Sequence, residues 1–542
     1  MKRKKEVMMV RIPGVFLFLL VMTWSFLTGP SVHAGKILVF PVDGSHWVNM
    51  NLMIQSLHSR GHEVTVVRTS TSWYVKERSP HYRSITVTLP QANLIEEEDF
   101  FLNFLVKMLE IKRHGASPVV FVKFYWEMLT ALSKIHKDGS LLVEEIFENR
   151  TLLQSMQDAQ FDVVLLDPGV PVGVLVANKL KLPMVFNVKW ITSGEGHFVA
   201  APSPTSYVPT SGYTVTDKMT FLERVKNNLF YVFNTWIDKL IVCSHYDRLM
   251  DKYFGPDVKF YHLLQGADIW LMRVDFVFEF PRPTMPNIFY IGGFQCKPSK
   301  PLPTELEEFV QSSGEHGFIL MSLGTLIKAL PSEITSEIAA AFAQLPQKVI
   351  WRHAGQRPNN LGNNTLLVKW MPQNDLLGHP KIKAFVAHGG NNGIYESIYH
   401  GVPIISIPLM FDQFENALRL EVRGAAKLVD VAKLTRQNFL EAVREVLNDP
   451  SYRNNMKRLS ALHRDQPMHP LDTAVFWTEF VMRHKGAAHL RTESYKMPWY
   501  SYHSVDVLCF LLAALITLTA AVVGSIRFIC LRLYRRRKLK HE

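Results

Sequence analysis

The chain has 542 residues, of which 47% are hydrophobic and 20% charged, so it can bury a large core, and a disordered or collagen-like chain is excluded. The formal net charge of +12 is concentrated at the two ends, because residues 1–34 contribute +4 and residues 527–542 contribute +6. The body of the chain is therefore nearly neutral, and nucleic acid is not an expected partner.

The N-terminal segment, residues 1–34, is typical of a cleaved secretory signal. Four of its first five residues are basic, an apolar run covers residues 15–27, and Val32-His33-Ala34 stands where the cleavage site is expected. The alternatives are a buried N-terminal helix and a retained anchor. They fit less well, because the apolar run is short for a membrane span and a strand pattern begins directly after Gly35.

The first half of the chain alternates between short apolar runs and helical stretches. Residues 36–40 and 64–67 predict two strands around a helix over residues 47–60, which is a βαβ unit. We predict a parallel sheet with helices on its faces for an N-terminal domain of residues 35–290. Its further predicted elements are strands at residues 161–166 and 184–188 and helices at 96–112, 117–150 and 170–180.

A stretch rich in proline and glycine, residues 280–303, predicts a linker between domains. The same alternation resumes after it, so we predict a second parallel α/β domain over residues 291–485. Two such domains that face each other place ligands at the carboxyl ends of their strands. The predicted elements are strands at residues 318–323, 349–352, 366–370, 384–387 and 404–407, with a helix at 332–343.

The C-terminal segment predicts one transmembrane helix, residues 505–527, after a juxtamembrane segment, residues 486–504. Residues 507–526 carry no charge, and a helix of that length crosses roughly 30 Å of hydrocarbon. The basic tail, residues 528–542, is expected in the cytosol, which leaves the rest of the chain luminal or extracellular in a single-pass type I topology. Lys538 and Lys540 resemble a dilysine signal for retrieval, so we expect the endoplasmic reticulum membrane.

Cysteine usage excludes a disulfide framework. Cys509 and Cys530 lie in or beside the predicted span, so Cys243 and Cys296 allow at most one luminal disulfide, and two buried free thiols are the simpler expectation. Asn149 and Asn363 begin acceptor triplets for N-glycosylation.

A dense cluster of polar and glycine residues follows the strands of the second domain. His388-Gly389-Gly390 stands between a strand and a helix, where backbone N–H groups can point at phosphate and no side chain on Gly390 obstructs the approach. Asn392 and Glu396 share one face of that helix, and the carboxylate suits ribose hydroxyls. With the flat ring of Trp370, the turn from Ser322 to Thr325 and the pair Asp412-Gln413, the pattern predicts a nucleotide-sugar site.

Residues 370–413, taken as one block, resemble the signature of the UDP-glycosyltransferase superfamily, and the vertebrate membrane branch, the UDP-glucuronosyltransferases, is similar in detail. The resemblance extends over nearly the whole chain and includes Gly44-Ser45-His46-Trp47, Ser322-Leu323-Gly324, Trp370-Met371-Pro372-Gln373, His388-Gly389-Gly390 and Phe411-Asp412-Gln413. It implies a GT-B fold, with two Rossmann-like domains that face a cleft, the donor bound mainly by the second domain and the acceptor mainly by the first.

The resemblance also implies roles for individual donor-site residues. Trp370 would stack on uracil, while Gln373 and Glu396 would contact the uridine, with Glu396 on the ribose. Ser322, His388 and Asn392 would contact the diphosphate, with Gly393 allowing close approach. Asp412 and Gln413 would contact the transferred sugar, and Arg352 resembles a further donor-side residue.

The expected chemistry needs a base near the acceptor hydroxyl. His46 lies in the loop after the first strand, and imidazole, with an ordinary pKa near 6.5, can take a proton at luminal pH. Asp167, at the end of another strand, resembles the family's partner aspartate and would orient the ring; the alternative is a strand-end cap before Pro168. No pair of carboxylates suggests a nucleophile and an acid, so we expect a single displacement with inversion.

The expected function is transfer of glucuronic acid from UDP-glucuronate to hydroxyl groups of small lipophilic acceptors, without a cofactor or metal, because no ligand set is evident. The resemblance does not identify the acceptor substrate, since family members differ most over the segments that correspond to residues 70–124 and 190–211. Two alternatives remain: another UDP-sugar donor such as UDP-glucose or UDP-xylose, and a non-catalytic regulatory partner of active relatives. The family also suggests a homo- or hetero-oligomer.

Overall fold

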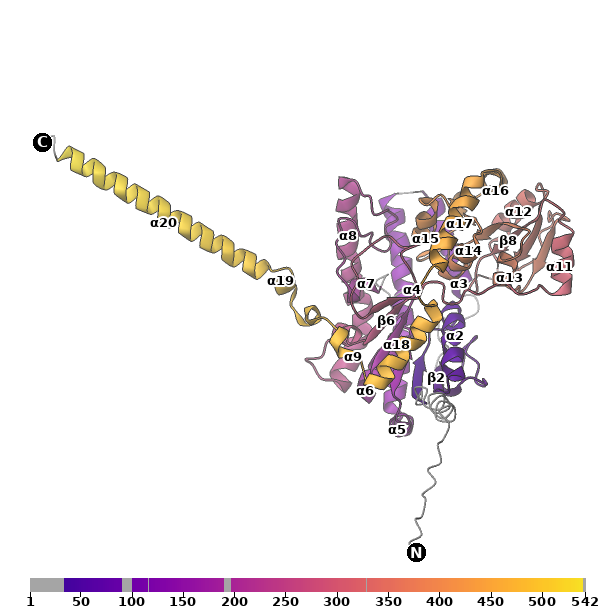
Figure 1. Ribbon diagram of the computed structural model, residues 1–542, viewed down its shortest axis with the longest axis horizontal. Helices are drawn as coiled ribbons and strands as arrows, with labels where there is room; N and C mark the ends of the chain where they lie inside the picture. The colour runs from indigo at the N-terminus through magenta and orange to yellow at the C-terminus, as the bar shows by residue number, and fades with distance from the viewer. Residues whose placement is uncertain (1–33, 90–99, 116, 190–195, 328, 540–542) are drawn as a thin grey trace, which may run out of the picture.

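The computed structural model describes residues 34–89, 100–115, 117–189, 196–327 and 329–539 (Figure 1). Residues 1–33 of the predicted signal sequence lie outside this set, as do Lys540 and residues 90–99 and 190–195 of the predicted acceptor-facing segments. The described residues form two parallel sheets covered by helices, and one long C-terminal helix extends away from the body (Figure 1).

The first sheet has seven strands in the order β3-β2-β1-β4-β5-β6-β7, and every pairing is parallel. Its central strands are apolar almost throughout because helices cover both faces. The apolar runs of the sequence predict β1, β2, β4 and β5 but not the short strands β3, β6 and β7. The bounds are β1 (Lys36–Phe40), β2 (Glu63–Thr69), β3 (Arg83–Val87), β4 (Val163–Leu166), β5 (Met184–Val188), β6 (Ile269–Met272) and β7 (Ile288–Tyr290).

Successive strand residues of the first sheet supply two separate cores, one on each face. Leu38 and Leu166 face a core with helices α4 (Pro118–Glu148), α6 (Val172–Leu180), α9 (Ser244–Tyr253) and α10 (Phe260–Gln265). Ile37 and Val39 face the opposite core, which α2 (Ser45–Ser59) and α18 (Pro470–His484) cover. Both cores are closed by helices, so the strand ends are the parts of the sheet left to build a site.

The second sheet has six parallel strands in the order β10-β9-β8-β11-β12-β13. Helices α12 (Ser332–Phe342) and α16 (Arg436–Asn448) cover one face. The other face carries α13 (Gln373–Leu377), α14 (Asn391–His400) and α17 (Pro450–Arg464). The strands are β8 (Phe318–Ser322), β9 (Lys348–Arg352), β10 (Thr365–Val368), β11 (Ile382–Ala387), β12 (Ile404–Ser406) and β13 (Ala426–Leu428), of which the sequence analysis omits β13.

Two helices pack against the sheet that is distant from them in the sequence. Helix α3 (Phe100–Arg113) places Phe104, Leu105 and Met108 in the core of the second sheet. Helix α18, near the C-terminus, returns to the first sheet and contacts α2. The domain limits predicted from the sequence stay predictions, and the packing shows that each half of the chain contributes a helix to the other.

The predicted helix over residues 117–150 is two helices in the structure. Helix α4 ends before Asn149, whose side-chain oxygen accepts a hydrogen bond from the N–H of Leu152 at 3.0 Å and caps α5 (Arg150–Asp158). Asn149 and Asn363 are both exposed, as a glycan acceptor requires.

Cys296 is a buried thiol outside any disulfide, so it does not form the bond with Cys243 that the sequence allows. Burial raises the pKa of the Cys296 thiol well above its usual value, and the side chain is a neutral part of the core.

The C-terminal helix α20 (Val505–Lys538) follows a short helix, α19 (Trp499–Tyr502), and extends away from both sheets (Figure 1). Its segment Val505–Arg537 is long and apolar enough to cross a membrane, and none of its most apolar window is buried by the rest of the protein. The leucines and phenylalanines along it, Leu508 and Phe510 among them, are exposed, which fits a membrane anchor.

Candidate active site between the two sheets

The carboxyl ends of strands from both sheets contribute to one small cavity. A space of about 50 Å³ is lined by Lys189 and Met272, after β5 and in β6, and by Asn391 and Asp412 from the second half of the chain. Ligands of doubly wound parallel sheets bind at this end of the strands. The cavity therefore marks where the two halves face each other.

His46 and Asp167, which are 121 positions apart in the sequence, meet at this edge of the first sheet. The Nδ1 atom of His46 lies 2.6 Å from Oδ2 of Asp167. The other carboxylate oxygen, Oδ1, accepts the N–H of Gly169 at 2.9 Å, which fixes the orientation of the buried carboxylate. Because Asp167 holds Nδ1, the second ring nitrogen, Nε2, is the one left to interact with a substrate.

His46 is placed by the start of α2 and not by a loop. Gly44 has φ of 74°, a left-handed conformation that glycine tolerates, and α2 begins at the next residue. The imidazole thus lies in the first turn of the helix, with 17% of its side chain exposed. This corrects the prediction that His46 lies in the loop after the first strand, and the early helix start gives the ring a rigid base.

The electrostatic surroundings keep His46 neutral. Burial lowers the pKa of its imidazole, and the cations Lys189 and Arg273 lower it further, while Asp167 opposes them; the net direction is down from the usual 6.5. A neutral ring can accept a proton near neutral pH, and Asp167 stabilises the imidazolium that then forms.

The phosphate-binding turn predicted at residues 388–390 has no room for side chains on its glycines. A Cβ on Gly389, whose φ is 83°, would lie 2.8 Å from the carbonyl oxygen of Gln413, and one on Gly390 would lie 2.3 Å from Nε2 of His388. Helix α14 starts directly after this turn, and its first-turn N–H groups have no intrahelical acceptors. The turn can therefore bring an anion close to the N-terminus of α14, whose first turn includes Gly393.

His388 is half-buried beside that helix start. Its Nδ1 has no hydrogen-bond partner among the described residues, and burial lowers the pKa of the ring to about 4, with Lys189 and Arg352 contributing in the same direction. Ser322, at the end of β8, accepts the N–H of Gly324 at 3.4 Å through its hydroxyl. A neutral histidine with a free ring nitrogen is suited to hydrogen bonding with a ligand.

Gln373 and Glu396 form one unit on α13 and α14. The amide Nε2 of Gln373 donates to Oε2 of Glu396 at 2.6 Å. Burial raises the pKa of Glu396 to about 7, against the opposing effect of the Gln373 hydrogen bond. Trp370, just after β10, is 73% exposed, so its ring face is open to a planar ligand.

Arg352, Asp412 and Gln413 support the neighbouring turns. Arg352 donates to the carbonyls of Gly324 and Lys369 and so ties the ends of strands β8, β9 and β10 together. The side-chain oxygen of Gln413 accepts the N–H groups of Leu409 and Met410 at 2.8 and 3.1 Å. Asp412 stands at the N-cap position of α15 (Gln413–Glu421) without a side-chain capping bond, and its Oδ2 accepts from Nδ2 of Asn416 at 2.9 Å.

Asn392, predicted to contact the diphosphate, contacts the first half of the chain in the structure. Its Oδ1 accepts from Nδ2 of Asn49 at 2.9 Å and from a guanidinium N–H of Arg273 at 3.0 Å. Asn49 also accepts from Nδ2 of Asn392 at 3.3 Å. This contact connects α2, which carries His46, to the start of α14.

Lys189 and Arg273 are site residues that the sequence analysis missed. Lys189 donates to the hydroxyl of Ser45 at 3.2 Å, and burial lowers the pKa of its ammonium group. Arg273 is only 2% exposed, and its Nε and NH1 have no partner among the described residues; burial lowers its pKa to about 10. Each directly follows a buried strand, Lys189 after β5 and Arg273 after β6. A charged residue at the end of a buried strand is the sequence pattern that could have identified them.

Within the residues that the structure describes, no group of three or more His, Cys, Asp or Glu side chains is placed to hold a metal ion. Positive charge at the site comes instead from Lys189, Arg273 and the start of α14. These groups can attract an anionic ligand without a bound ion.

Comparison with known proteins gives one family over the whole body of the chain. Residues 35–540 match the family model of UDP-glucoronosyl and UDP-glucosyl transferase. UDP-glucuronosyltransferase 2A3 of Mus musculus is 43% identical over 514 residues, covering 93% of this chain and 94% of its own. UDP-glucuronosyltransferase 2B15 of Homo sapiens is 40% identical over 531 residues, covering 96% of each chain.

Solved glycosyltransferases share the fold at low sequence identity. Spinosyn forosaminyltransferase SpnP is 17% identical with a TM-score of 0.53, covering 82% of this chain and 99% of its own. The calicheamicin glycosyltransferase CalG4 is 17% identical with a TM-score of 0.52, covering 83% and 99%. The fold is thus GT-B, and the chain belongs to the UDP-glucuronosyl and UDP-glucosyl transferase family, as a glycosyltransferase with a UDP-sugar as co-substrate.

Proposed function

We propose that this glycosyltransferase transfers glucuronic acid from UDP-glucuronate to hydroxyl groups of small lipophilic acceptors and inverts the anomeric centre, giving β-D-glucuronides and UDP. The observation that carries the proposal is the part-buried contact of 2.6 Å between His46 and Asp167, with His46 on a helix that also bonds through Asn49 to Asn392 at the start of α14. His46 and Asp167 can remove a proton, and the start of α14 can hold a nucleoside diphosphate.

In the proposed reaction, Nε2 of His46 accepts the proton of the acceptor hydroxyl. The acceptor oxygen forms a bond to the anomeric carbon of the sugar, and the bond from that carbon to the β-phosphate oxygen breaks, so the electron pair leaves with UDP. Asp167 holds Nδ1–H and stabilises the imidazolium. One displacement without a covalent sugar intermediate inverts the α-linked donor.

The donor is proposed to lie along the second sheet. Its diphosphate would lie at the N-terminus of α14, beside the half-buried ring of His388 and the Ser322 turn. Its uracil would stack on Trp370 and its ribose would bond to Glu396, which Gln373 orients. The sugar hydroxyls would contact Asp412 and Gln413.

The two cations at the cleft favour glucuronate over an uncharged sugar. Arg273 is buried, and two of its nitrogen atoms have no hydrogen-bond partner among the residues that the structure describes. Lys189 lies beside His46, and burial lowers the pKa of its ammonium group. Bringing in a carboxylate would offset the cost of these buried charges, whereas glucose or xylose would not.

The proposed location is the endoplasmic reticulum membrane, with both sheets in the lumen. Helix α20 would span the bilayer, and the arginines at its C-terminal end, Arg535 to Arg537, would lie on the cytosolic side. A lipophilic acceptor, which partitions into the membrane, would then be available to the enzyme.

The test uses microsomes that contain the full-length protein, permeabilised so that the donor reaches the lumen. Labelled UDP-glucuronate, UDP-glucose and UDP-xylose are supplied in parallel with a panel of phenols. A product that β-glucuronidase cleaves is expected with UDP-glucuronate. Transfer from another UDP-sugar alone would overturn glucuronate as the transferred sugar. Full activity in intact, unpermeabilised microsomes would overturn the luminal orientation.

The non-catalytic alternative is tested by His46→Ala. We expect this variant to lose turnover while it keeps its affinity for UDP, because His46 belongs to the first half of the chain and the donor site to the second. If turnover survives in the variant, His46 is not the base; if the unaltered protein transfers nothing to a broad acceptor panel, the regulatory role is correct.

A further inference from the structure

Helix α8 (Phe221–Ile237) turns its apolar residues away from the protein. Leu222, Val225, Leu229, Val232 and Trp236 follow one another at spacings of three or four, so they share one face, and each is exposed. A helix on a soluble body normally buries such a face. Two questions follow from the outward orientation: what holds the helix in this rotation, and what covers its outer face.

The cause is a pair of asparagines on the inner face. Asn227 is fully buried and donates from Nδ2 to the carbonyls of Thr205 and Val208, both at 2.8 Å, while its Oδ1 accepts the N–H of Thr210 at 2.7 Å. Asn234, two turns later, donates to the carbonyl of Ser211 at 2.7 Å. These bonds fix the rotation of α8 about its axis. Because the asparagines face the protein, the apolar residues on the opposite side of the helix face outward.

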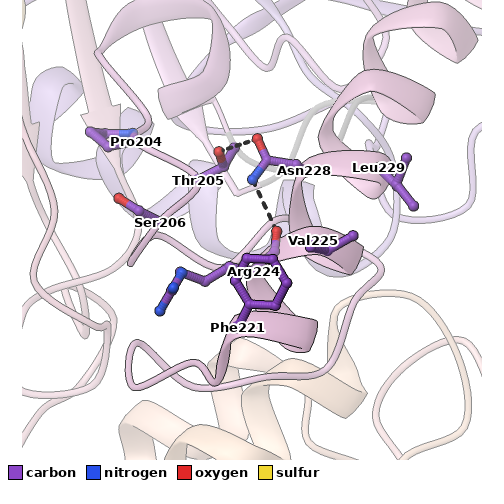
Figure 2. Close-up of a pocket in the computed structure, with 8 residues that line it drawn as sticks. All are labelled: Pro204, Thr205, Ser206, Phe221, Arg224, Val225, Asn228 and Leu229. Atoms are coloured by element: carbon purple, nitrogen blue, oxygen red, sulfur yellow. Dashed lines mark hydrogen bonds between the residues drawn. The ribbon is translucent and has the colours of Figure 1, made fainter.

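Figure 2 shows the N-terminal part of this face, where Phe221, Val225 and Leu229 lie beside the segment that carries Pro204 and Thr205. These residues line an open groove of about 600 Å³. Asn228, on the same helix, accepts from the hydroxyl of Thr205 at 2.7 Å (Figure 2). The groove is thus open and largely apolar, with Thr205 and Asn228 hydrogen-bonded to each other and Arg224 and Ser206 as its other polar lining residues.

The apolar surface continues onto the start of α4. Phe121 packs against Tyr125 and, with a centroid distance of 6.3 Å, against Phe230 of α8. Val122 and Trp126, on the same helix, are 64% and 68% exposed. Two neighbouring helices therefore present one surface, larger than the scattered apolar side chains usual on a soluble protein.

The membrane anchor is held close to this surface. Tyr231 of α8 packs against Phe198 of the short helix α7 (His197–Ala200). The carbonyl of Ala200, in the same short helix, accepts a hydrogen bond from the hydroxyl of Tyr495 at 2.6 Å. The hydroxyl of Tyr502, in α19, lies near enough to contribute to the raised pKa of Tyr231, after burial. Val505, where α20 begins, is ten positions after Tyr495, so the body cannot lie more than about 35 Å from the start of the span.

We propose that the outer face of α8, with the start of α4, docks onto the surface of the bilayer that α20 crosses. Figure 1 shows α8 on the side of the body from which α20 leaves. Tryptophan and tyrosine favour the lipid interface, and exposed aromatic residues stand at both parts of the contact: Trp126 and Trp236 on the docking face, and Trp499 and Tyr500 in α19. An amphipathic helix that lies in the interface needs this combination of an apolar face and aromatic ends.

The test places the photo-crosslinker p-benzoylphenylalanine at Leu222 or Leu229 in the full-length protein, reconstituted in vesicles of radiolabelled phosphatidylcholine. The matched control is Leu462 of α17, which is 56% exposed against 64% for Leu229 but lies on the second half of the chain. We expect lipid adducts at Leu222 and Leu229 that exceed those at Leu462 at least severalfold. Binding of UDP by each variant verifies that it is folded.

Two results would overturn the proposal. Equal lipid adducts at Leu229 and Leu462 would mean that the face stays in solvent. Adducts at Leu229 to a second copy of the protein, without lipid adducts, would mean that the face is an interface between copies. Charge reversal gives an independent readout: Leu222→Glu with Leu229→Glu should raise KM for a membrane-partitioned acceptor in vesicles and leave KM unchanged in detergent, and an equal KM in both media contradicts docking.

Discussion

At the scale of single residues, His46 can serve as a base in only one tautomer. Asp167 selects this tautomer because its Oδ2 accepts from Nδ1–H, and Gly169 holds the other oxygen so that the carboxylate cannot rotate. The proton-accepting nitrogen is therefore decided by a backbone N–H two residues after Asp167. The same geometry allows a sharp test of the pair.

Asp167→Asn should lower kcat on the order of 10³- to 10⁴-fold and leave the affinity for UDP unchanged. The N–H of Gly169 would keep Oδ1 of the new amide in place, so its NH₂ would face Nδ1 of His46 and force the proton onto Nε2. Turnover by stopped assay and UDP binding by calorimetry measure the two quantities. A loss below tenfold would leave Asp167 as a strand-end cap.

The pH dependence should reflect the cations around His46. The ring must be neutral to act, and its pKa is lowered by burial, so kcat/KM should fall only below about pH 6.5, the ordinary histidine pKa. Lys189→Met removes a positive charge that lowers this pKa and should move the acid limb to higher pH. Lys259→Met, at an exposed site, is the control. An unmoved acid limb in the Lys189 variant would contradict the electrostatic assignment.

At the scale of elements, the turn before α14 links strand β11 to the helix start through residues that tolerate no Cβ. The turn also sets the position of His388, since Gly390 and Gly324 both lie against its ring. The helix N-terminus, the neutral histidine and the glycines thus act as one unit, and a small change in any of them should alter the donor site.

Gly390→Ala should weaken UDP binding about tenfold or more, because its Cβ would lie 2.3 Å from Nε2 of His388 and displace the ring. Gly524→Ala, in α20, is the matched control, since a Cβ there meets no atom within 4 Å. Calorimetry with UDP measures both. Equal affinity in the two variants would remove this turn from the donor site.

At the scale of the whole molecule, the two halves of the chain exchange helices. Helix α3 packs in the core of the second sheet, α18 covers the first sheet, and Asn49 bonds to Asn392 across the cleft. The last of these contacts connects α2, which carries His46, to α14, where the proposed donor site starts. Relative movement of the halves therefore has to strain contacts at several points.

Leu105→Ala should destabilise the protein by about 3 kcal/mol, because Leu105 is fully buried in the second core and the surrounding helices cannot close the space. Leu462→Ala, at an exposed leucine, should change stability by less than about 0.5 kcal/mol. Thermal inactivation of UDP binding in detergent compares them. Similar midpoints would show that α3 contributes little to the second half.

Most of the fold could be predicted from the sequence, and so could most residues of the candidate site, whose roles remain predictions. Parallel sheets were predictable because buried strands are nearly continuous apolar runs, as β4 and β5 are. His46, Asp167 and the His388 turn were predictable because chemistry gathers at strand ends, and the family resemblance gave them roles. Short strands such as β7 carried too few residues to show a pattern.

The sequence by itself therefore determined the two α/β halves, the apolar C-terminal span and the polar groups at the strand ends, because these depend on local periodicity and composition. Only the tertiary structure decided that α3 and α18 exchange partners, that Lys189 and Arg273 lie beside His46, and that Asn227 turns α8 outward. Each of these depends on contacts between residues far apart in the chain, or on which face of a helix finds hydrogen-bond partners, and local patterns do not encode either.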